Sequence, residues 1–295
     1  MNVTQVQIGQ SVVLTLTAYS DGTATDQGPF TIGIVDANGD TVVSSGTAVS
    51  DGSDGTYTYT LAAQSDPAFL TVTWTETGGS GPDYTTYVEV VGNVLFNEYE
   101  LRNFDDQQLS ASNLNPSDSS ILLVRQRVTE YLEQQTGRSW IPRYNRVVLN
   151  GSGNYDLYLD DGYPRTSGGF TLHRPGSLRD ISEILAANDG SAVTVSNITH
   201  YPEGHLVRSD ATWTKPTSTT PLNTTVEYVY GLPVPVDGVD RVAMMIAAHQ
   251  LKASRIPDNA SSFSDPLGTY QFDSTRLPFE AWKWIQAHRE YAPFA

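Results

Sequence analysis

The chain has 295 residues, a formal net charge of −16 and no cysteine. The missing cysteines exclude a disulfide framework, a thiolate zinc site and a thiol nucleophile, and the acidic balance disfavours gripping nucleic acid. No apolar run approaches the ~20 residues that a membrane-spanning helix needs. The first residues show no signal-peptide pattern, and the length predicts two domains.

Charge divides the chain near residue 101. Residues 1–101 contain 12 acidic and no basic residues, whereas residues 102–295 contain 21 acidic and 17 basic residues. Together with a change of hydrophobic period, this step predicts an N-terminal β domain over residues 1–92, a connector over 93–117 and a second domain over 118–295.

The first region alternates apolar and polar residues with a period of two, which is typical of strands. Seven runs between turn residues are expected to be strands, near residues 3–8, 11–19, 30–36, 40–45, 55–62, 68–76 and 84–91. This many short strands in about 90 residues predicts an immunoglobulin-like (Ig-like) sandwich. Trp74 is the expected core anchor, and Asn38-Gly39 predicts a type I′ hairpin turn.

Helical periodicity begins in the connector, where residues 97–104 are a candidate short helix. In the second domain, apolar residues at helical spacing predict helices over about 118–136, 238–254 and 278–291. Gly137 stands where a left-handed C-terminal stop belongs.

A β-rich region over about 146–231 separates the first two of these helices. The expected strands lie near residues 146–150, 155–159, 170–172, 181–187, 192–198, 206–208 and 225–230. Residues 257–276 show no periodicity, which is typical of a functional or mobile loop. The fold class is therefore α+β and multidomain, with an Ig-like sandwich before a helical domain that carries a β-rich insertion.

The histidines offer one candidate metal site. His200 and His205 flank Glu203, and this stretch predicts either a metal pair or, more simply, a polar hairpin turn at residues 202–204. His249 and His288 lie on apolar helical faces and are expected to be hydrogen-bonded packing residues. The fifth histidine is His173.

Three acidic clusters are candidate sites. The stretch from Asp36 to Asp40 has the first three ligand positions of a calcium loop, but Thr47 stands where the twelfth-position acid belongs, so a plain hairpin is favoured. The residues from Asp51 to Asp54 predict a turn. Asp160-Asp161 is either a carboxylate pair or a solvated loop.

No phosphate-binding, dinucleotide-binding, zinc-protease or nucleophile-elbow motif occurs in the chain. We therefore expect no catalytic residue, no metal and no cofactor, and we predict that the protein is not an enzyme.

The C-terminal segment is rich in aromatic residues. Trp282 and Trp284 are two positions apart on one helix and point to different sides. A buried stripe of Phe279, Trp282 and Ile285 would leave three aromatic side chains for a partner, and these are the candidate docking residues: Trp284, Tyr291 and Phe294. The alternatives are that both tryptophans lie in the core, or that the loop over 257–275 docks the partner.

An ordered set of features extends from about residue 97 to the end of the chain. It comprises a helix ending in Tyr131-Leu-Glu-Gln-Gln-Thr-Gly-Arg-Ser-Trp140, then Ile141-Pro-Arg143, a strand at residues 146–151, Val226-Glu-Tyr-Val-Tyr-Gly231 and an Ala-rich helix at residues 242–251. The set resembles the head-to-tail connector adaptors of tailed double-stranded DNA phages. The chain departs from many adaptors in carrying an N-terminal Ig-like module.

The resemblance implies a structural virion protein at the head–tail interface, assembled in the host cytoplasm. It implies a homo-oligomeric ring of twelve copies seated under the portal protein, with a stopper or tail-terminator protein beneath. Double-stranded DNA would pass through the lumen without sequence-specific binding, and no membrane is involved. An acidic lumen that does not hold DNA is consistent with this role.

Two other functions remain open from the sequence. A surface adhesin or carbohydrate-binding module would use the Ig-like domain and exposed aromatic side chains, and a glycosidase would use Asp160 and Asp161.

Overall fold

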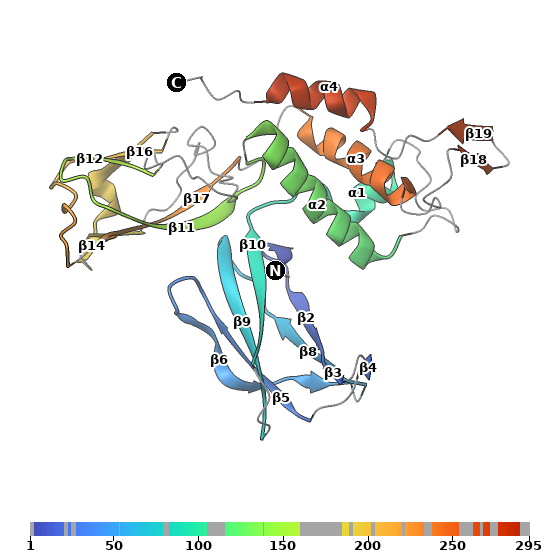
Figure 1. Cartoon of the computed structure of the whole chain (residues 1–295), viewed down its shortest axis with the longest axis horizontal. Coiled ribbons are helices and arrows are strands. Elements are labelled where there is room, and N and C mark those ends of the chain that lie inside the picture. The colour runs from blue at the N-terminus through green and yellow to red at the C-terminus, as the bar shows by residue number, and fades with distance from the viewer. Residues whose placement is uncertain are drawn as a thin grey trace.

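The computed structural model of the chain describes the following residues: 3–20, 23–24, 28–52, 54–78, 83–104, 116–137, 139–159, 185–188, 191–201, 204–219, 222–232, 238–253, 262–265, 268–271 and 277–289. Figure 1 shows three parts: an N-terminal sandwich, a helical part, and a β-rich part that extends away from the helices.

The sandwich has two main sheets. The larger has the order β1-β10-β9-β5-β6, made of Val3–Gln7, Tyr84–Val91, Ala68–Glu76, Phe30–Val35 and Thr41–Ala48. The smaller has the order β2-β8-β7, made of Val12–Thr17, Thr56–Leu61 and Ser50–Asp51. A short hairpin, β3 (Tyr19–Ser20) and β4 (Thr23–Ala24), follows β2.

The strand order is that of an Ig-like domain. In the larger sheet, strands β10, β9, β5 and β6 pair antiparallel in that order, and β1 runs parallel to β10 at the edge. The chain crosses from one sheet to the other between β2 and β5, between β6 and β7 and between β8 and β9, as in the Greek-key connections of Ig domains. The seven expected strands are confirmed, whereas the two-residue strands β3, β4 and β7 were not predicted because so short a run has no measurable period.

Among the described residues of the sandwich, the buried side chains are apolar. Burial alternates strictly along β5, as the pleat requires. Trp74 is fully buried, which confirms it as a core anchor, and its indole Nε1 donates to Thr86 Oγ1 at 3.3 Å.

The β5–β6 hairpin lies where it was expected, but the turn type was wrong. A type I′ turn needs positive φ at both central residues, and among the described residues of this turn only Gly39 has it, at 86°. Asp36 explains the difference, because its Oδ1 accepts from the N–H groups of Asn38 and Asp40 at 2.8 and 2.9 Å. These two hydrogen bonds to the Asp36 carboxylate hold the turn in a conformation other than type I′.

The described residues of the helical part form four α-helices: α1 (Glu98–Arg102), α2 (Asp118–Thr136), α3 (Val239–Ala253) and α4 (Phe279–His288). Asn97 forms a capping box with Glu100 at the start of α1. Ser117 caps α2, and Gly137 ends it at φ 72°, as the sequence predicted. The apolar faces of these helices share one core, which also contains Trp140 and Ile141.

The β-rich part, residues 143–230, has a core of its own around Trp213, Leu206 and Val226. One sheet has the order β11-β17-β13-β14, from Arg143–Leu149, Thr224–Tyr230, Leu185–Asn188 and Ser191–Val193. The other has the order β12-β16-β15, from Asp156–Tyr158, His205–Arg208 and Ile198–His200, with the 3-10 turn η3 (Val195–Asn197) before β15. The strand expected at 170–172 lies outside the described residues.

The expected loop over 257–276 contains a hairpin that the sequence did not predict. Its strands are β18 (Ser262–Asp265) and β19 (Gly268–Gln271). Four-residue strands with one aromatic residue each carry too little apolar alternation to be recognised as a pattern.

Candidate interaction surfaces

The sandwich joins the helical part through a close backbone contact. Val91 ends β10 and already belongs to the helical core, together with Leu95 and Phe96. The Gly92 N–H donates to the Pro142 carbonyl at 2.9 Å. A Cβ at Gly92 would lie 2.6 Å from the Pro142 Cβ, so the approach requires glycine here. The connection is therefore a packed junction.

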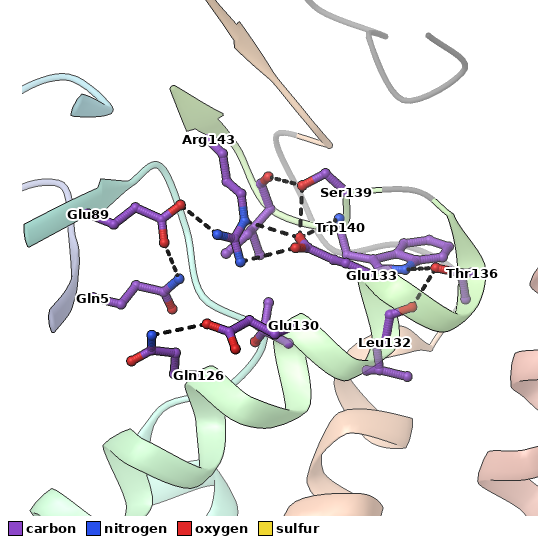
Figure 2. Close-up of polar contacts among 12 residues, drawn as sticks. Gln5, Glu89, Gln126, Glu130, Leu132, Glu133, Thr136, Ser139, Trp140 and Arg143 are labelled. Atoms are coloured by element: carbon purple, nitrogen blue, oxygen red, sulfur yellow. Dashed lines mark hydrogen bonds and ion pairs between the residues drawn. The ribbon is translucent and has the colours of Figure 1, made fainter. Parts of the chain in front are cut away.

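Arg143 forms a charged network at this junction (Figure 2). From β11, its guanidinium reaches Glu89 of the sandwich at 2.5 Å and Glu133 of α2 at 3.0 Å. Gln5 of β1 donates to the other oxygen of Glu89 at 3.0 Å. Arg143 thus links all three parts of the molecule, since it lies on a strand of the β-rich part. A buried cation held by two carboxylates fixes orientation more than it adds stability.

Glu133 is buried and accepts from several donors. Its Oε1 lies 2.8 Å from Ser139 Oγ and 3.3 Å from the Trp140 N–H and from Arg143 Nε. A second chain of bonds runs beside it, from Trp140 Nε1 to Thr136 Oγ1 and from there to the Leu132 carbonyl. These bonds hold the turn after α2 against the helix.

Burial and the neighbouring charges shift the pKa values of Glu133 and Arg143 in opposite directions. Burial raises the pKa of the Glu133 carboxyl, and the Arg143 cation acts in the opposite direction. Burial lowers the pKa of the Arg143 guanidinium, but the carboxylates of Glu133 and Glu89 outweigh it, so the net pKa is raised. Burial also raises the pKa of the nearby Tyr230 hydroxyl well above its usual range. Arg143 is therefore permanently charged and needs both acids.

The predicted buried stripe on α4 was right for Ile285 and wrong for Phe279 and Trp282. Ala281 and Ile285 are buried, whereas Phe279 is 73% and Trp282 50% exposed. Trp284, expected to point outward, packs on Trp140 with ring centroids 5.2 Å apart. Both stripes have helical spacing, and the contact of Trp284 with Trp140 distinguishes them.

Of the three candidate docking residues, the structure describes Trp284. Trp284 is half-buried and stacks on His288 at 4.0 Å, and His288 Nδ1 bonds the Trp284 carbonyl at 2.8 Å. This confirms His288 as a packing histidine. Tyr291 and Phe294 lie outside the described residues, so their docking role stays a prediction.

Among the described residues of the helical part, exposed apolar side chains lie next to each other on α4 and on α2. On α4, Phe279 and Trp282 stack on each other with centroids 6.2 Å apart. On α2, Leu122 and Leu123 are 40% and 48% exposed. Large exposed apolar side chains in such groups are typical of surfaces that a partner covers.

The β-rich part presents an aromatic ladder, Tyr158–His205–Tyr201. His205 on the central strand β16 stacks on Tyr158 at 4.6 Å and on Tyr201 at 5.2 Å. Its Nε2 lies 2.7 Å from Asp156 Oδ1. The hairpin expected between His200 and His205 is confirmed by the bond from the Gly204 N–H to the Tyr201 carbonyl. The sequence feature that could have predicted this ladder is the clustering of tyrosines near these histidines.

The other acidic candidates do not converge on a site. Asp36 and Asp54 accept bonds from backbone N–H groups of their own turns. Glu203, His173 and the Asp160-Asp161 pair lie outside the described residues. Within the described part of the chain, no group of three His, Asp or Glu side chains is placed to hold a metal ion. The described helices include none long and apolar enough to cross a membrane.

No family model and no curated protein matches the chain. Two solved structures are similar to part of it. The ZIG-8–RIG-5 IG1–IG1 heterodimer, in its monoclinic form, is 13% identical with a TM-score of 0.22, covering 30% of this chain and 81% of that chain. The ZIG-8 IG1 homodimer is 12% identical with a TM-score of 0.21, covering 30% and 78%. Likeness at this level carries no argument about function.

Proposed function

We propose that the protein is a non-enzymatic assembly protein, a head-to-tail connector that forms a ring between a phage portal and the next tail component. The proposal starts from the resemblance of residues 97–295 to connector adaptors. The order of elements is compatible with it: a long helix, α2, precedes a β-rich part, and α3 and α4 follow.

The observation that carries the proposal is the pair of exposed apolar surfaces on the helical part. Phe279 and Trp282 on α4, and Leu122 and Leu123 on α2, belong to helices whose other faces already pack in the core. Exposed apolar side chains that are grouped on one face are typical of surfaces that a partner covers. A ring subunit has contacts on more than one side and needs such surfaces.

The docking residues are revised in this proposal. Phe279 and Trp282 join Tyr291 and Phe294 as candidates for the portal contact, and Trp284 supports α4 from within. A stacked aromatic pair is the kind of anchor that dominates binding energy at interfaces.

Co-sedimentation with assembled portal tests the proposal. We expect the full chain to sediment with the portal, and the double variant Phe279→Ala/Trp282→Ala to lose at least about tenfold in affinity. The matched control is Tyr99→Ala, because Tyr99 is 77% exposed on α1. A chain ending at Arg289 keeps the described contacts of α4 and separates the role of Tyr291 and Phe294. No binding by the full chain would contradict the proposal.

A surface-binding module is the second candidate, and the exposed Tyr158–His205–Tyr201 ladder favours it. Aromatic faces beside a carboxylate such as Asp156 are suited to holding a sugar ring. A glycan array probed with the full chain and with Tyr158→Ala distinguishes the two functions. Glycan binding that the substitution abolishes, without portal binding, would favour the adhesin.

A further inference from the structure

Strand β2 leaves one edge of the smaller sheet open. The sheet order is β2-β8-β7, so β2 pairs with β8 on one side and with no described strand on the other. Its six residues, Val12–Thr17, keep a continuous register with β8. Figure 1 shows β2 at the margin of the sandwich.

The hydrogen-bond pattern identifies the outward-facing groups. The Ala18 N–H donates to the Gly55 carbonyl at 2.8 Å, directly after the Thr17–Thr56 pair. Bonded and non-bonded pairs alternate in an antiparallel ladder, so the N–H and C=O groups of Val13, Thr15 and Thr17 point away from β8. The bond from the Gly52 N–H to the Thr56 carbonyl agrees, because it places the backbone of Thr56 on the β7 side.

This edge lacks the protection that the sandwich's other long edge has. Strand β6 is interrupted by two register shifts against β5, and Gly46 within it has φ 86°. Such bulges twist an edge away from a new strand. Strand β2 has no bulge, proline or charged residue, and Val13 is 60% exposed. A flat edge of this kind is suited to strand addition.

The charge of the sandwich indicates which kind of added strand would fit the β2 edge. Residues 1–101 carry 12 acidic and no basic residues. Asp54 lies in the turn that precedes β8, next to Gly55, whose carbonyl bonds the Ala18 N–H at the end of β2. Asp51 belongs to the same sheet, although β8 separates its strand, β7, from β2. A second copy of the sandwich would bring the same charges and be repelled, whereas a basic segment would be attracted.

We propose that the β2 edge binds an extended, lysine- or arginine-rich segment of a partner protein by strand addition. Backbone bonds to Val13, Thr15 and Thr17 hold the segment, and the carboxylates of the sandwich select its charge. This surface is separate from the helical surfaces assigned to the portal, so either proposal can fail without the other.

Hydrogen exchange on the full-length chain, with a defined peptide, tests the proposal. The probe is a nine-residue peptide alternating lysine and valine, and its matched control has glutamate at every lysine. In the free protein, the amides of Val13, Thr15 and Thr17 should exchange quickly and those of Leu14 and Leu16 slowly. The lysine peptide should slow the first set at least about tenfold, the glutamate peptide should not, and added salt should weaken the effect.

Two substitutions at one position separate backbone from side-chain effects. Thr15→Pro removes an outward N–H and should lower peptide affinity about tenfold or more, whereas Thr15→Val keeps the N–H and should bind as the unchanged chain does. Protection of Val13 and Thr15 without peptide, rising with protein concentration, would identify a second copy as the occupant and overturn the proposal. Equal binding of both peptides, or none, would also overturn it.

Discussion

The sandwich and the rest of the molecule are stabilised in different ways. All the buried polar and charged side chains among the described residues lie at or beyond Arg125, and they include Glu133, Arg143, Arg208 and Glu227. The buried side chains of the sandwich are apolar. The sandwich therefore depends on packing, and the C-terminal parts also depend on the pairing of buried charges.

The largest expected loss of stability follows from a substitution in the apolar core of the sandwich. Trp74→Ala removes a fully buried side chain and should destabilise the sandwich by roughly 3–5 kcal/mol. Denaturant unfolding of the full chain measures the loss. The matched control is Trp282→Ala, which removes a half-exposed tryptophan and should cost less than about 1 kcal/mol. Equal effects would mean that the sandwich interior is not the tightly packed core described.

The charged network gives the next largest effect. Arg143→Met leaves Glu133 and Glu89 buried near each other without a cation and should cost roughly 3–5 kcal/mol. Arg241→Met is the control, since Arg241 lies 4.0 Å from Glu280 and both side chains are exposed, at 64% and 71%. Thermal unfolding of both variants is the measurement, and an Arg143 variant as stable as the control would break the comparison.

Separating the sandwich from the rest of the chain should have a smaller effect on stability. A fragment of residues 1–95 should unfold cooperatively on its own. It should be less stable than the sandwich within the full chain by about 2 kcal/mol, because Val91 loses its place in the helical core. Hydrogen exchange of the β9 and β10 amides in both forms measures the difference. A fragment with no cooperative transition would show that the sandwich needs the junction to fold.

The smallest effect concerns acid pH in the β-rich part. Hydrogen bonds from Arg208 lower the pKa of the Asp210 carboxyl from 3.8 to about 2. The ionised carboxylate therefore favours the folded state at pH above about 4, and this contribution is lost as pH falls toward 2. Asp210→Asn should remove that portion of the acid sensitivity, measured by unfolding between pH 2 and 5. An unchanged pH profile would show that the Arg208–Asp210 pair contributes nothing measurable.

The sequence predicted the elements better than their contacts. The strands of the sandwich and the limits of α2 follow from local period, caps and turn residues. The exposed face of α4 was mispredicted because two stripes had the same spacing, and only contact with Trp140 distinguishes them. Local pattern carries no information about which of two equivalent faces meets a distant residue.

The charged junction was beyond the reach of the sequence for a related reason. Glu89 and Arg143 are 54 positions apart in the sequence. The only sequence feature that drew attention to Arg143 was the stretch that resembles connector adaptors. One signal was present: Thr129, Glu133 and Thr136 follow the helical spacing of α2 on a second buried stripe. A glutamate on such a stripe requires a buried cation or a set of donors.

Imaging of the protein mixed with assembled portal tests the central claim most directly. A connector should appear as a closed ring of copies around a central lumen at one end of the portal, with the sandwiches in equivalent positions around it. A protein that stays monomeric beside unoccupied portals, at concentrations well above those that support co-sedimentation of known tail components, would contradict the connector proposal.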